Sequence, residues 1–161
     1  MSADGILVDL QEMEDFRDHL TPHLQQIASA LTTLTHSDAP QLGSFYHAQQ
    51  AEQRYEALRV DFVARLRRLI LALAVSDAGI GSILDAYETR GHNSVASLKT
   101  AGDVLNDDRA ARAAVRSDPV LADILRQDPQ LSKVLSGGSG DSLTNAITDS
   151  SAMIRGANTD V

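Results

Sequence analysis

The first part of the chain carries one stripe of apolar side chains at steps of three and four residues. The stripe consists of Leu10, Met13, Phe16, Leu20, Leu24, Ile27, Leu31 and Leu34. This spacing gathers the side chains along one side of an α-helix, and it predicts a helix over about residues 6–35. Pro22 follows Thr21 inside the stripe. Because proline lacks the backbone N–H that a helix interior needs, we expect either a kink there or a restart capped by Thr21.

A second apolar stripe predicts a longer helix, over about residues 45–90. Between the two helices, turn-forming residues end in Gly43 and Ser44, so we expect a turn at Gly43 and Phe45, with Ser44 capping the second helix. Much of the second stripe keeps near-heptad spacing, which is typical of a seam between neighbouring helices. We predict that this seam is a partner interface made of Tyr55, Leu58, Phe62, Leu66, Leu69, Leu73 and Ile80.

The two predicted helices differ in length. At 1.5 Å per residue the second would be roughly 69 Å long and the first about 45 Å. Gly79 and Gly81 lie near the end of the second stripe. Since glycine weakens a helix interior, we expect a bend or frayed joint at these glycines, beyond the part that the first helix covers.

Two helices alone cannot cover all the apolar positions of the second stripe, because Val60, Val63, Ile70 and Leu71 flank the seam. A second layer is needed, either from another chain or from the protein's own tail. The predicted fold is all-α: a long antiparallel helical hairpin that forms a four-helix-type bundle by pairing, followed by short helices. The predicted organisation is a hairpin domain over 1–92, a short-helix tail over 93–136 and a flexible or weakly helical end over 137–161.

The tail contains a short repeat. "DPVLADIL" (118–125) and "DPQLSKVL" (128–135) share the pattern Asp-Pro-x-Leu-x-x-[Ile/Val]-Leu at a ten-residue offset. Aspartate is a favoured helix N-cap and proline is tolerated in the first helical turn, so we predict one short helix per unit, with its leucines on one face.

Composition narrows the function. The net charge of −8 argues against sequence-independent nucleic-acid binding, and the cluster Arg65, Arg67 and Arg68 is best read as a solvated helix flank with Asp61 paired at i, i+4. The chain has no cysteine, its start lacks the features of a cleavable signal peptide, and its longest apolar run is too short to span a bilayer.

Catalytic signatures are missing from the sequence. Asp15, His19 and His23 would align on an unbroken helix, but Pro22 disturbs the register and no fourth ligand is evident, so solvated polar residues are the better reading. The sequence shows no nucleophile elbow, phosphate loop or dinucleotide fingerprint. We therefore predict a protein that is not an enzyme, with no cofactor, no metal and no catalytic residue.

The region of about 6–91 combines Gly43 with Phe45 and Ala48, a Leu/Ala-rich second helix, and the ending Ala86-Tyr87-Glu88. On these residues it resembles the Trp-x-Gly superfamily of type VII (ESX-type) secretion substrates. Gln41 stands where the family has its tryptophan, and Gly91 stands four residues after Tyr87, where the family's export element has an acid.

The resemblance implies pairing as a homodimer or heterodimer with another helical-hairpin protein. It also implies contact with a secretion machinery and a secreted or cell-surface location reached without a signal peptide. In the family, a Tyr-x-x-x-Asp/Glu export element lies just past the second helix; here Tyr87 and Glu88 are the candidates, although Tyr87 also fits as the last apolar residue of the helix.

A second reading is open. The Asp-Pro-x-Leu units are similar to the short helices of co-chaperone DP modules, where leucine faces form a groove for an apolar segment. On this reading the protein is a soluble cytoplasmic helical adaptor or chaperone-like module, and the tail folds back over the hairpin or binds a client.

Overall fold

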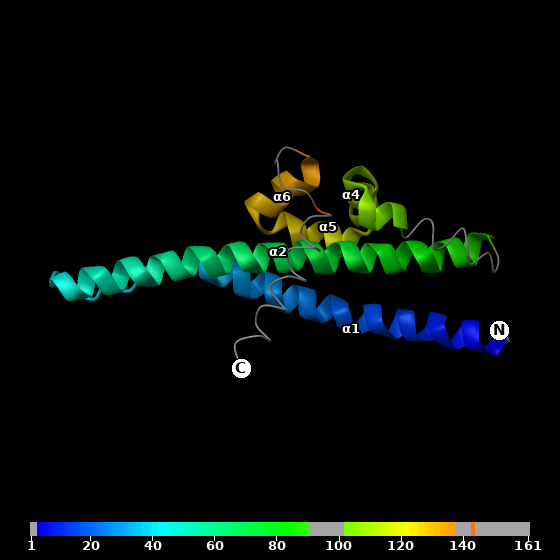
Figure 1. The fold of residues 1–161 in the computed structure, drawn as a ribbon, viewed down its shortest axis with the longest axis horizontal. Coiled ribbons are helices and arrows are strands. Elements are labelled where there is room, and N and C mark those ends of the chain that lie inside the picture. The colour runs from blue at the N-terminus through cyan, green and yellow to red at the C-terminus, as the bar shows by residue number, and fades with distance from the viewer. Residues whose placement is uncertain (1–2, 91–101, 138–142, 144–161) are drawn as a thin grey trace.

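The structure, a computed structural model, describes residues 3–90, 102–137 and 143, and all its regular elements in these ranges are helices (Figure 1). They are α1 (Ala3–His36), α2 (Tyr46–Arg90), α4 (Asp108–Ser117), α5 (Pro119–Arg126) and α6 (Pro129–Ser136), with a further helical segment at 102–106. The all-α prediction is confirmed. Apart from Gly137 and Leu143, the predicted flexible end lies outside the described residues.

The first helix runs through its proline. α1 extends from Ala3 to His36 with Pro22 inside it, so the predicted restart at Thr21 is wrong. The hydroxyl of Thr21 instead donates to the carbonyl of Arg17, four residues earlier. The buried residues Leu20 and Leu24 lie on either side of the proline, and their packing compensates for the hydrogen bond that proline cannot make.

α1 and α2 lie side by side and run in opposite directions (Figure 1). Near the end of α1, the guanidinium of Arg59 donates to the carbonyl oxygen of Leu34 at 2.7 Å. The first turns of α2, before Arg59, therefore reach past the end of α1. The unmatched length of α2 is at this end of the molecule, where the two helices are connected.

The predicted frayed joint at Gly79 and Gly81 is wrong, because both lie inside the continuous helix α2. The alternative, a bend at these glycines, stays a prediction. The two glycines differ in their surroundings. A Cβ atom on Gly81 would lie 3.0 Å from the Arg17 guanidinium, which would have to shift, whereas one on Gly79 would meet Leu105 at 3.8 Å, an ordinary van der Waals contact. Only Gly81 therefore has a neighbour that a larger side chain would displace.

The tail helices, which we define as α4–α6, fold back onto the long helices. α4 packs on α2 and α5 contacts α1 (Figure 1). A single hydrophobic cluster joins all five helices; its fully buried members include Leu24, Leu31, Ile70, Val75, Val115, Leu121, Leu125, Leu131 and Leu143. The protein's own tail thus supplies one second layer. That residues 1–92 form a domain by themselves stays a prediction.

The caps of the repeat are confirmed. Asp118 and Asp128 are the N-caps of α5 and α6, and Pro119 and Pro129 begin these helices. The leucines of both units, Leu121, Leu125, Leu131 and Leu135, are buried. Each Asp-Pro unit therefore delivers its apolar face to the shared core.

Candidate interaction surface

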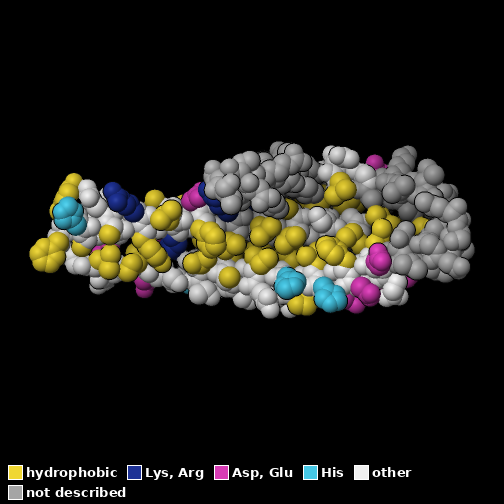
Figure 2. Space-filling view, turned by 60° about the horizontal axis from the view of Figure 1, so that its bottom comes forward, with side chains coloured by type: hydrophobic (Ala, Val, Ile, Leu, Met, Phe, Trp, Pro, Cys, Tyr) yellow, Lys and Arg dark blue, Asp and Glu magenta, His cyan; other side chains and the backbone are white. Residues whose placement is uncertain are grey.

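One apolar surface of the long helices is not covered by the other helices that the structure describes, and we call it the open face. It lies on the side away from the tail helices, and Figure 2 shows apolar side chains as a band along the length of the molecule on this side. By helical periodicity its members are Phe16, Ile27 and Leu34 of α1 and Tyr55, Leu58, Phe62, Leu66, Leu69, Leu73 and Ile80 of α2. Four of them, Ile27, Leu34, Leu66 and Leu73, also pack against the edge of the core. The α2 members are the residues that the sequence predicts as a partner interface.

Exposure differs along the open face. Leu58 is 69% exposed, Phe62 is 52% exposed and Tyr55 is 39% exposed, whereas Leu66, Leu69, Leu73 and Ile80 are half-buried. Phe16 of α1 is 53% exposed. Large apolar side chains that line up on one surface are unusual for a protein that works alone, and they mark a site of interaction.

The connection between α1 and α2 carries a second group of exposed apolar residues. Gly43 adopts a left-handed backbone conformation (φ 107°), and Phe45 and Tyr46 follow it with most of their surfaces in solvent. The backbone N–H of Leu42 donates to Glu52 at 2.6 Å, which holds the connection against the first turns of α2. Glycine is favoured at position 43 because other residues rarely adopt this conformation.

The candidate export residues lie inside the second helix. α2 continues to Arg90, so half-buried Tyr87 and exposed Glu88 are in its last turn and not past its end. Leu10 and Leu84 join both residues in the lining of a shallow groove of about 250 Å³ between α1 and α2. The position four residues after Tyr87 is outside the described residues.

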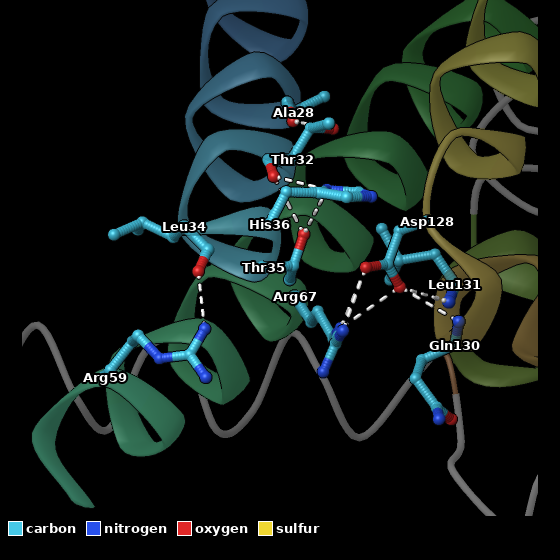
Figure 3. A network of polar contacts seen from close by, with 10 residues as sticks. All are labelled: Ala28, Thr32, Leu34, Thr35, His36, Arg59, Arg67, Asp128, Gln130 and Leu131. Atoms are coloured by element: carbon cyan, nitrogen blue, oxygen red, sulfur yellow. Dashed lines mark hydrogen bonds and ion pairs between the residues drawn. The ribbon is translucent and has the colours of Figure 1, made fainter. Parts of the chain in front are cut away.

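The tail helices are fastened to the long helices by ion pairs at both Asp-Pro units. Arg67 of α2 reaches Asp128, with its Nη2 atom 2.9 Å from Oδ2 and its Nε atom 3.1 Å from Oδ1 (Figure 3). Oδ1 of Asp128 also accepts the backbone N–H groups of Gln130 and Leu131. Burial alone would raise the pKa of Asp128, but the Arg67 and backbone hydrogen bonds together hold the pKa below its usual value.

The first Asp-Pro unit repeats this arrangement. Oδ1 of Asp118 accepts the backbone N–H of Val120 at 3.0 Å, while Oδ2 accepts from Arg17 at 3.0 Å. In both units one carboxylate therefore caps its own helix and binds an arginine of a long helix. We call the residues Arg17, Arg67, Asp118 and Asp128 the latch.

Arg17 also neutralises a buried carboxylate. Its Nε atom donates to Oδ1 of Asp77, whose side chain is 2% exposed. Burial raises the pKa of Asp77, and the hydrogen bond and charge of Arg17 offset that effect only in part. One arginine of α1 thus binds α2 through Asp77 and α5 through Asp118.

The sequence did not reveal the latch. Asp61 and Arg65 form the predicted pair at 2.9 Å, but Arg67 from the same basic cluster is not a solvated flank residue. A usable signal was the capping aspartate itself: an N-cap uses one carboxylate oxygen, which leaves the other for a cation. The ion pair of Asp77 had a signal too, since a lone acid in an apolar run needs a partner.

The described residues show no metal centre, because no three His, Asp or Glu side chains among them come together to hold an ion. Where His19 and Asp15 meet on α1, Nδ1 of His19 lies 2.7 Å from the Asp15 backbone carbonyl. A shallow, polar groove of about 490 Å³ is lined by Glu14, Asp18 and Asp85 around Arg17.

By length and composition alone, α2 is apolar enough to cross a membrane. Half of the apolar window is buried inside the protein, and the helix also carries the buried ion pair of Asp77. The core helix of a soluble protein meets the same criterion, so this finding is weak evidence for a span.

Comparison of the chain with protein-family models, with curated proteins and with solved structures finds no match.

Proposed function

We propose that this protein is a non-enzymatic partner-binding protein that pairs with another helical hairpin through its open face. The observation that supports the proposal is the band of apolar side chains on the side of α1 and α2 away from the tail helices. Packing it against a similar surface would complete a four-helix-type bundle and remove large side chains such as Leu58 and Phe62 from water. The partner is a second copy or a different helical-hairpin protein.

We further propose that the pairing serves type VII secretion, as a substrate or a secretion-associated protein that reaches the cell surface or medium without a signal peptide. The support is the resemblance of residues 6–91 together with the long paired helices. The adaptor alternative, a cytoplasmic protein that binds apolar segments through its Asp-Pro helices, has less support. Leu121, Leu125, Leu131 and Leu135, which would line its groove, are buried in the protein's own core.

Phe62→Asp tests the pairing. Phe62 is half-exposed and outside the core cluster, so the variant will keep its helicity. A charge placed in an apolar interface costs several kcal/mol, and we expect pairing at least about tenfold weaker. The measurement is solution mass by light scattering over a dilution series, with far-UV circular dichroism on each sample.

Val60→Asp is the matched control for Phe62→Asp. Val60 is 57% exposed on the same helix but lies on another side, so this variant will pair as the wild type does. A wild-type chain that is monomeric at every concentration rules out self-pairing, and equal weakening by both variants rules out the open face as the interface.

Tyr87→Ala tests the export reading. We expect the variant to be lost from the culture medium of a type VII-competent host while its melting temperature changes little, because Tyr87 is only half-buried near the end of α2. Tyr46→Ala removes an exposed tyrosine at the opposite end of α2 and will be exported normally. Equal amounts of Tyr87→Ala and wild-type protein in the medium would reject Tyr87 as an export residue.

A further inference from the structure

α2 has apolar side chains on two opposite sides. Leu69 and Leu73 belong to the open face, while Leu71 and Val75, two residues further on in each case, are buried. A two-residue step turns about 200° around a helix, so these pairs point in nearly opposite directions. α2 therefore separates the open face from a second apolar surface.

α4 packs on α2 at this second surface, together with the segment 102–106, and we call the surface the covered face. Its members are Leu71, Val75, Ala78 and Gly79, on the same line of the helix as Arg67. Arg67 binds Asp128 at one end of this line. At the other end, Ala78 shares a groove with Ala114 and Pro119, and Gly79 lies against Val104 and Leu105.

We propose that the tail helices limit assembly, because they occupy the face of α2 onto which the open face of a second copy would otherwise pack. The proposal rests on the open face being a pairing surface, as in the proposed function. Both surfaces are apolar and run along the same helix. Once the tail helices are released, the covered face of one copy therefore becomes available to pack against the open face of another.

The symmetry of such a contact determines which kind of assembly it forms. Contact between two different surfaces on opposite sides of one helix is heterologous: one copy uses its open face and the other its covered face, so the pair still has one free surface of each kind. Heterologous contacts that do not close into a ring produce open-ended assemblies. A chain whose covered face is blocked has only its open face left, and its pairing stops at a closed complex.

The latch is the natural place to release the tail helices. Asp118 and Asp128 each combine a helix cap with an ion pair to a long helix, so their loss weakens α5 and α6 and their attachment together. Replacing the aspartates is preferable to replacing the arginines, because it leaves no buried charge without a partner. Arg17 keeps Asp77 as its partner, and the side chain of Arg67, 27% exposed, can reach water.

The experiment compares full-length Asp118→Ala/Asp128→Ala with the wild type. The matched control is Asp61→Ala/Asp123→Ala, which removes the same charge from exposed pairs with Arg65 and Arg126. Solution mass is measured by light scattering, helicity by circular dichroism, and release of the tail helices by the rate of trypsin cleavage after Arg116 and Arg126. We expect the latch variant to be cleaved at least tenfold faster and to at least double in average mass, and the control to match the wild type.

A third variant identifies the surface used. Adding Leu71→Glu to the latch variant places a charge on the covered face and should return the mass to that of the wild type. Faster cleavage without a rise in mass overturns the proposal, as does unchanged cleavage or a collapse of helicity, which would show that the tail helices are not separable from the fold. A larger mass that persists with Leu71→Glu also overturns it.

These outcomes are distinguishable from failure of the proposed function. If Phe62→Asp abolishes wild-type pairing but the latch variant gains no mass, the open face pairs and the tail helices do not limit assembly. If the wild type is monomeric and the released latch variant is monomeric too, the proposal that the tail helices limit assembly fails, and pairing in the proposed function is restricted to a different helical-hairpin protein.

Discussion

Replacing Arg17 with methionine will lower the free energy of unfolding by about 3 kcal/mol. The reason is Asp77, whose side chain is 2% exposed and has Arg17 as its cationic partner. Methionine preserves much of the length and apolar stem of the side chain but leaves a buried carboxylate without a counter-charge. The loss is measured by urea unfolding followed by circular dichroism.

The Arg17→Met deficit will depend on pH in a defined direction. Burial already raises the pKa of Asp77, and loss of Arg17 will raise that pKa further. A carboxylate with a raised folded-state pKa binds protons more tightly in the folded protein than in the unfolded chain. The free energy of unfolding that the variant loses at pH 7 will therefore be regained as the pH falls through the raised folded-state pKa of Asp77. It is regained completely only below the pKa of aspartate in the unfolded chain, about 3.9.

Arg65→Met is the control for Arg17→Met. Arg65 pairs with Asp61 at 2.9 Å, but both side chains are more than half exposed. An exposed pair contributes about 0–1 kcal/mol, so this variant will unfold almost as the wild type does. Equal losses for the two variants, or a loss at Arg17 that is independent of pH, would contradict the role given to Asp77.

Leu125→Ala will destabilise the whole protein by about 2–5 kcal/mol, although it lies in a helix of only eight residues. Leu125 is fully buried in the cluster that joins α5 to both long helices. Truncation removes that apolar contact and leaves a cavity where the tail helices meet α1 and α2. The measurement is thermal unfolding followed by far-UV circular dichroism, a signal to which the long helices α1 and α2 contribute most.

Val120→Ala tests whether the effect of Leu125→Ala comes from the shared core. Val120 belongs to the same helix but is 44% exposed, so its truncation will cost less than about 1 kcal/mol. Equal losses for Leu125→Ala and Val120→Ala would contradict the role given to Leu125 in the shared core.

The sequence predicted those parts of the fold that depend on local pattern. The second stripe placed a helix at about 45–90, and α2 spans Tyr46–Arg90. The Asp-Pro units predicted α5 and α6 with their caps, because an aspartate followed by proline and a leucine face specifies a helix start within a few residues. Of the residues that the heptad pattern assigned to a partner interface, Tyr55, Leu58 and Phe62 are exposed on α2, and that they bind a partner stays a prediction.

The remaining features depend on contacts between distant parts of the chain. Arg17 is 101 positions from Asp118 and 60 from Asp77, and no local pattern relates them. The continuity of α1 through Pro22 depends on neighbours that local propensity does not include. Likewise, Gly79 and Gly81 suggested a weakened helix, whereas α2 is continuous there and the Arg17 guanidinium of α1 lies where a side chain on Gly81 would be.

The position of the latch along the chain has a consequence for synthesis on the ribosome. α2 is complete at Arg90, but its covered face is secured only when Asp128 has emerged and can reach Arg67. At about 5–20 residues per second, this leaves an interval of several seconds in which the nascent helix shows apolar residues on both sides. A partner or chaperone that acts during translation will meet a different surface from the one on the finished protein.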